Sequence, residues 1–100
     1  MERYDLLYDE TERVNVNFVG MTTEKVRYDF GIMYTNMFFG KSLITCMQTG
    51  RSILLCAEDA TDVEQIQKLF KIKELSEAKA LSEFFSEVLP VTSLQQQYSD

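Results

Sequence analysis

The chain has 100 residues, of which 45% are hydrophobic and 26% charged, with no histidine or tryptophan and a net charge of −6. This length and composition are typical of one globular domain and exclude collagen-like, disulfide-dense and wholly disordered proteins. Without histidine the chain lacks the commonest general base and metal ligand, and no apolar run is long enough to span a membrane. We expect a single α+β domain over residues 1–90 and a mobile polar tail over residues 91–100.

The first 57 residues predict an antiparallel meander of about five strands, because apolar segments are separated by short polar turns. These segments are residues 4–8, 14–18, 26–34, 38–48 and 51–57. In the second segment Val14, Val16 and Phe18 alternate with polar residues, and we expect these three side chains to face inward.

The last two segments predict a hairpin whose two-residue Thr49-Gly50 turn places Gln48 opposite Arg51. In that register Cys46 and Cys56 lie on opposite faces and cannot form a disulfide, whereas a three-residue loop would bring them to one face. We expect two reduced, buried thiols. One face of the hairpin carries Ile44, Cys46, Ile53 and Leu55, and the other carries Leu43, Met47, Leu54 and Cys56.

The second half of the chain has helical periodicity. Thr61-Asp62-Val63-Glu64 predicts a capping box that starts a first helix, and Ser76 is the expected cap of a second helix that ends before Pro90. The apolar stripes are Val63, Ile66, Leu69 and Phe70, then Leu81, Phe84, Phe85 and Val88. Residues 58–89 also hold eight acids against four bases, which we interpret as a solvated face.

Two helices can cover only one face of such a sheet, yet both faces of the predicted hairpin are apolar. The other face requires a second subunit, a strongly curled and barrel-like sheet, or the C-terminal tail. Aromatic residues near the turns are of the kind enriched at interfaces, so we expect a homodimer.

No set of residues indicates catalysis, a metal site or a cofactor. Phe39-Gly40-Lys41-Ser42 ends like a phosphate-binding loop, but Thr35 stands where that motif needs its first glycine. The acids of residues 5–12 lack calcium-loop spacing. We therefore expect a protein that is not an enzyme. Its acidity disfavours nucleic acid and anionic membranes, and the absence of a signal-peptide pattern predicts a cytoplasmic location.

The leading hypothesis is a protein-binding or regulatory module that acts as a homodimer, with a further, unidentified protein partner left open. The candidate partner-binding residues cluster around two turns: Tyr34, Asn36, Phe38, Phe39, Lys41 and Arg51. The alternative is a small-molecule binder or minor enzyme whose pocket is lined by Arg27, Asp29, Tyr34 and Lys41.

Several short segments resemble a family of small cytosolic proteins of unknown function from Gram-positive, Bacillus-type bacteria. The similar segments are Leu7-Tyr8-Asp9-Glu10-Thr11, Tyr34-Thr35-Asn36, Phe38-Phe39-Gly40-Lys41, Gln48-Thr49-Gly50-Arg51-Ser52 and Phe84-Phe85-Ser86-Glu87-Val88-Leu89. The resemblance covers residues 4–89, and the glutamine-containing tail departs from it. It implies no known activity, cofactor or catalytic residue.

Overall fold

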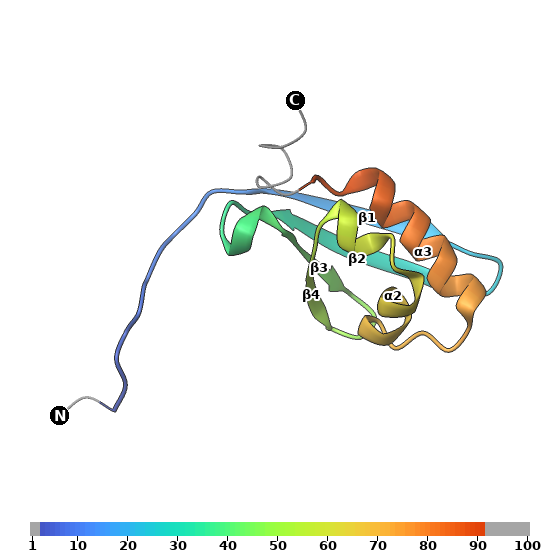
Figure 1. Ribbon diagram of the computed structural model, residues 1–100, viewed down its shortest axis with the longest axis horizontal. Coiled ribbons are helices and arrows are strands. Elements are labelled where there is room, and N and C mark those ends of the chain that lie inside the picture. The colour runs from blue at the N-terminus through green and yellow to red at the C-terminus, as the bar shows by residue number, and fades with distance from the viewer. Residues whose placement is uncertain (1–2, 92–100) are drawn as a thin grey trace.

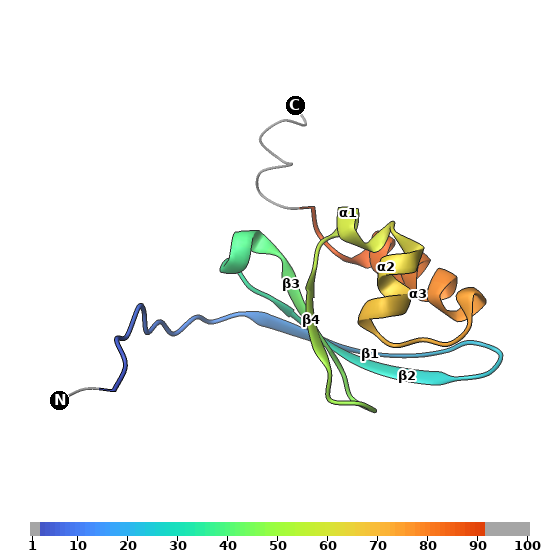
Figure 2. The ribbon, with the colours of Figure 1, turned by 60° about the horizontal axis from the view of Figure 1, so that its bottom comes forward.

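A computed structural model describes residues 3–91 and has the predicted α+β class. Four strands form one antiparallel sheet in chain order: β1 (Asn15–Thr22), β2 (Arg27–Tyr34), β3 (Ser42–Cys46) and β4 (Ser52–Leu55). A short 3-10 turn, η1 (Phe38–Gly40), precedes β3, and three helices follow the sheet: α1 (Ala57–Ala60), α2 (Val63–Leu69) and α3 (Leu75–Val88). The helices lie together on one face of the sheet (Figures 1 and 2).

Over the described residues the strand count is four and not five. Residues 3–14 belong to no strand, and the apolar side chains of the expected first strand are exposed. Figures 1 and 2 both show this segment running away from the body of the protein. The expected tail falls almost wholly on residues 92–100, which lie outside the described residues.

The core is built around Phe30, which joins the sheet to the helices. Its ring lies 5.0 Å from that of Phe85 and 5.8 Å from that of Phe70, both in edge-to-face geometry, and 5.9 Å from the stacked ring of Tyr28. Such aromatic pairs stabilise beyond the apolar area that they bury. The large, fully buried aliphatic side chains of the core are Ile32, Ile44, Leu55, Ile66 and Leu81.

The β3–β4 hairpin has the predicted faces in a different register. The expected partner of Ile53 is Cys46, but Ile53 pairs with Ile44. The loop between the two strands therefore spans residues 47–50. Because the pairing is offset by two residues, the side chains of β3 and β4 stay on their expected faces, whereas Cys56 follows β4 and is buried at the start of α1. Cys46 and Cys56 are both buried and unpaired, as expected.

Strand β1 alternates as predicted but faces the other way. Val16 and Phe18 are 44% and 73% exposed, and it is Val19 and Met21 that pack against the core. Pairing of Phe18 with Gly31 and of Val19 with Phe30 sets this orientation, since residues paired across two strands share a face. The expectation that Val16 and Phe18 face inward is wrong.

The helix starts also differ from the prediction. Asp62 caps α2 by accepting a hydrogen bond from the backbone N–H of Gln65 at 3.1 Å. Thr61 instead ends the additional helix α1, where its hydroxyl donates to the carbonyl of Glu58. Helix α3 begins at Leu75, one residue before the expected cap. The side chains of Asp62 and Thr61 satisfy helix-end groups that lack intrahelical partners, whereas Glu74, which precedes α3, makes no side-chain capping hydrogen bond.

Replacing Phe85 with alanine should lower the free energy of unfolding by about 3–5 kcal/mol, because it leaves a cavity beside Phe30. Urea denaturation followed by circular dichroism measures this loss. The matched control is Leu75→Ala on the same helix, where the side chain is 56% exposed and the expected change is within about 0.5 kcal/mol. Equal losses in the two variants would contradict the central position of Phe85.

Candidate functional site

The face of the sheet opposite the helices is apolar and uncovered over the described residues. We call it the open face, and all four strands contribute apolar side chains to it: Val16, Phe18, Met33, Leu43, Met47 and Leu54. Phe18, on the edge strand β1, is the most exposed of them at 73%. Monomeric proteins rarely expose contiguous apolar patches of this kind unless the patch is functional. The alternative of a curled sheet that buries both of its faces within one chain is therefore not what the described residues form.

Gly31 makes the open face continuous from β1 to β3. A Cβ atom at this position would lie 2.9 Å from Met47 Cε and 3.4 Å from Phe18 Cε1. The side chains of Phe18 and Met47 thus lie over the glycine and bury it from opposite sides. The absence of a side chain on β2 lets two strands that are not neighbours share one apolar surface.

A hollow of about 290 Å³ opens at one end of the open face. Met33, Leu43 and Leu54 form its base, and Phe38 of the turn before β3 lines it as well. An apolar side chain of a partner fits such a hollow, because burial there removes apolar surface of both molecules from water.

An extended segment, residues 3–11, leads into β1 and carries its own exposed apolar residues. We call this segment the arm. The exposed fractions are 73% for Tyr4, 69% for Leu6, 89% for Leu7 and 56% for Tyr8. Residues 4–8 of the arm are the first strand expected from the sequence; the acidic Asp9 and Glu10 interrupt their apolar pattern, and the segment pairs with no strand.

Glu12 fixes the base of the arm to the turn after β2. One carboxylate oxygen accepts from the Thr35 hydroxyl, and the other accepts from the backbone N–H of Asn36 at 2.8 Å. These two hydrogen bonds, that of Thr35 first, hold the pKa of Glu12 below its ordinary value. The direction in which the arm leaves the sheet is therefore set by a charged contact.

The turn between β2 and β3 brings together most of the predicted partner-binding residues. Phe38 and Phe39 have φ angles of +53° and +65°, a region that side chains other than glycine rarely adopt. Phe39 is 85% exposed, whereas Tyr34 is half-buried among the core residues on the helix side. Arg51 lies at the opposite end of the β3–β4 hairpin from this turn.

Lys41 is held away from the open face by an ion pair. Its Nζ lies 2.8 Å from Asp59 Oδ2, and this hydrogen bond raises the pKa of Lys41. Burial favours a higher pKa for Asp59, but hydrogen bonds from Lys41 and Cys56 outweigh it and the pKa falls. Lys41 thus links the start of β3 to α1. It precedes a strand, whereas the lysine of a phosphate-binding loop leads into a helix.

The alternative pocket of Arg27, Asp29, Tyr34 and Lys41 does not form. Arg27 and Asp29 share the open side of β2, where they form an ion pair of 3.1 Å, while Tyr34 lies on the covered side of the same strand. Lys41 is committed to Asp59. Alternating side chains on one strand cannot line one pocket from both faces.

Cys56 is not an activated nucleophile. Burial is the main reason that the pKa of the Cys56 thiol rises to about 11, so this group stays protonated at neutral pH. Among residues 3–91 no cluster of acidic and cysteine side chains has the arrangement of a metal site. In the same part of the chain no helix is long and apolar enough to cross a bilayer.

Comparison with known proteins identifies a family without an activity in its description. A family model described as SAV0927-like matches residues 7–87, which include all strands and nearly all of α3. No curated protein matches the sequence. The match agrees with the resemblance to small bacterial proteins of unknown function.

The Glu12 contact predicts a titration that is visible at Asn36. As the pH falls through the lowered pKa of Glu12, protonation removes the acceptor and the Asn36 amide signal should shift, with a midpoint below 4.5. NMR spectra recorded across this range measure the midpoint. Glu12→Gln should abolish the titration, and Glu10→Gln, at an exposed arm position, should leave it unchanged. A midpoint at or above 4.5 would contradict the contact.

Substitution by glycine tests whether the positive φ angle of Phe39 strains the backbone in the turn before β3. Phe39→Gly should leave stability unchanged or raise it by up to about 1 kcal/mol, because it relieves a left-handed backbone at an exposed position. Met37→Gly, where φ is −79°, should instead lower stability by at least about 0.5 kcal/mol. Urea denaturation of both variants measures the difference, and equal destabilisation would refute the strain at Phe39.

Proposed function

The chain belongs to the SAV0927-like family, and we propose that it is a non-enzymatic protein-binding or regulatory module that acts as a homodimer. One observation carries the proposal: the open face exposes apolar side chains from all four strands. A second copy of the chain offers a surface of the same chemistry. In a dimer with two-fold symmetry, the open faces of both subunits would be buried against each other.

The arm supports the second copy as the occupant. Its apolar residues are more exposed than most of those on the open face, so each chain presents both a donor segment and an acceptor surface. A nine-residue extended segment reaches about 30 Å, which exceeds the width of four strands, roughly 15–20 Å. The arm is therefore long enough to cross the sheet of a partner subunit, and reciprocal exchange is favoured by two-fold symmetry.

The border of the open face is where a further protein partner would bind. Phe38 adjoins the apolar hollow, and Phe39 and Asn36 project from the same turn. Arg51 marks the other end of the hairpin, so it would serve a separate part of the interface. The net charge of −6 argues against nucleic acid and anionic membranes as partners, and a cytoplasmic location is part of this proposal.

Light scattering behind a sizing column tests the dimer at two concentrations about tenfold apart. The expected mass is twice 11.6 kDa at both concentrations. Phe18→Asp should give a folded monomer, because the position is exposed in one copy and a dimer interface there would have to bury an unpaired charge. Circular dichroism checks that the variant is folded.

The matched control is Leu75→Asp, which places the same charge at an exposed leucine on the helix side. This variant should remain a dimer. A wild-type monomer at both concentrations, or a dimer that survives Phe18→Asp, would overturn the proposal.

A further inference from the structure

A cavity of about 480 Å³ lies on the helix side of the sheet, away from the open face. It is enclosed by the first residues of β2, the β3–β4 loop, the α2–α3 loop and α3. Its volume lies in the range of small-molecule sites. We propose that this cavity binds a small organic cation, in which an ammonium group is attached to an apolar body of about the size of one aromatic ring.

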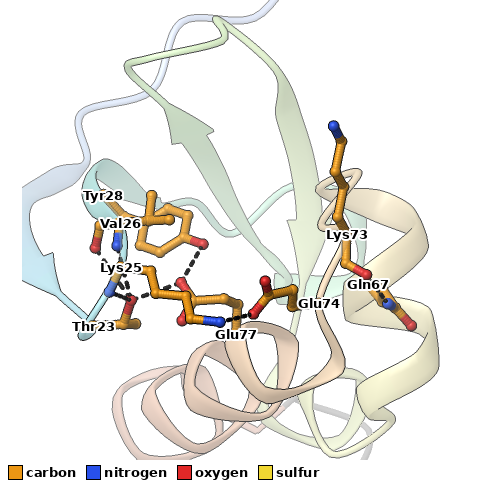
Figure 3. Close-up of polar contacts among 8 residues, drawn as sticks. All are labelled: Thr23, Lys25, Val26, Tyr28, Gln67, Lys73, Glu74 and Glu77. Atoms are coloured by element: carbon orange, nitrogen blue, oxygen red, sulfur yellow. Dashed lines mark hydrogen bonds and ion pairs between the residues drawn. The ribbon is translucent and has the colours of Figure 1, made fainter.

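Glu77 supplies the anionic end of this site. The residue is 7% exposed and lines the cavity, and one carboxylate oxygen, Oε1, accepts from the Thr23 hydroxyl at 2.7 Å and from the Tyr28 hydroxyl at 3.0 Å (Figure 3). Both donors are neutral. Over the described residues no hydrogen bond reaches Oε2 and no cationic side chain forms a salt bridge with Glu77.

A buried carboxylate normally has a cationic partner, because an uncompensated charge is costly away from water. The nearest candidate is Lys25, but its Nζ lies 2.6 Å from Glu74 Oε2 on the exposed rim (Figure 3). That hydrogen bond is the main cause of the raised pKa of Lys25, and Glu77 contributes only at longer range. A ligand ammonium would supply the partner that Glu77 lacks, through the Oε2 atom.

The walls of the cavity suit the rest of such a ligand. Tyr28 and Phe70 are partly buried and present aromatic surface, Ile72 adds aliphatic surface, and the fully buried Phe30 and Leu81 lie beneath them. Aromatic faces attract cations and also accept an apolar ring by stacking. Burial raises the pKa of Tyr28 to about 12, with a further contribution from Glu77, so its hydroxyl remains a donor to the carboxylate.

The α2–α3 loop is held in place before a ligand arrives. Gln67 Nε2 donates to the carbonyl oxygen of Lys73 at 3.2 Å (Figure 3). In the same view the Lys73 ammonium points away from Glu77. Among the described residues, none of the basic side chains that line the cavity forms a salt bridge with Glu77, so an anionic ligand would meet the Glu77 carboxylate at the buried end.

The test uses three probes of one shape and different charge: 2-phenylethylammonium, 2-phenylethanol and phenylacetate. They are titrated into the full-length chain at neutral pH and followed by NMR. The ammonium compound should bind saturably and at least about tenfold more tightly than the other two, with shifts at Tyr28 and residues 70–74. Tighter binding of phenylacetate, equal binding of all three probes, or no saturable binding would overturn the proposal.

Glu77→Gln should bring ammonium binding down to the level of the alcohol, since the amide keeps the acceptor oxygen and removes the charge. Glu83→Gln, at an exposed position on the same helix, is the control and should bind like the wild type. If Glu77→Gln does not fold, Ile72→Phe tests the site by filling the cavity with Glu77 intact. Unchanged ammonium binding in a folded Glu77→Gln or Ile72→Phe variant would refute the site.

Discussion

The contact of Phe30 with Phe70 and Phe85 is the interaction on which the arrangement of this protein depends. It fastens the centre of the sheet to α3 and to the residue that ends α2. All three helices are drawn to the same face, because the buried side of each one belongs to this single core. Because all three helices lie on one face, no other helix or strand of the described residues covers the opposite face. The open face and the arm are therefore exposed.

Much of the fold could be predicted because alternation along a strand is a local property. The hairpin faces were correct despite a wrong register, since an even offset preserves the side on which each residue lies. The face of β1 could not be predicted in this way: both sides of Phe18-Val19 are apolar, and only pairing with β2 decides between them. The arm was misassigned for a similar reason, because its pattern is that of a strand but it has no strand beside it.

The candidate site residues show the same contrast between local sequence patterns and contacts among distant segments. Phe38 and Phe39 are an aromatic pair beside a glycine, which makes them candidates from the sequence, and they are exposed, whereas Tyr34 belongs to the core. Glu77 was not singled out, although it precedes Leu81 by one helical turn and therefore lies on the apolar stripe of α3. An acidic residue on an apolar helix stripe is the sequence feature that could have indicated a buried carboxylate. The hydroxyl groups that hold the carboxylate come from the β1–β2 turn and β2, far away in the chain, and no spacing rule predicts them.

The order of elements along the chain has a consequence during synthesis. All four strands precede α3, so they leave the ribosome before Phe85 is available to cover Phe30. The four strands are consecutive neighbours, so the meander can form before α3 is made. Until then its apolar side chains are exposed to solvent on both faces. Such intermediates are prone to aggregation. The nascent chain is therefore most vulnerable in the interval between completion of β4 and emergence of α3, when a holding chaperone would find two surfaces to bind.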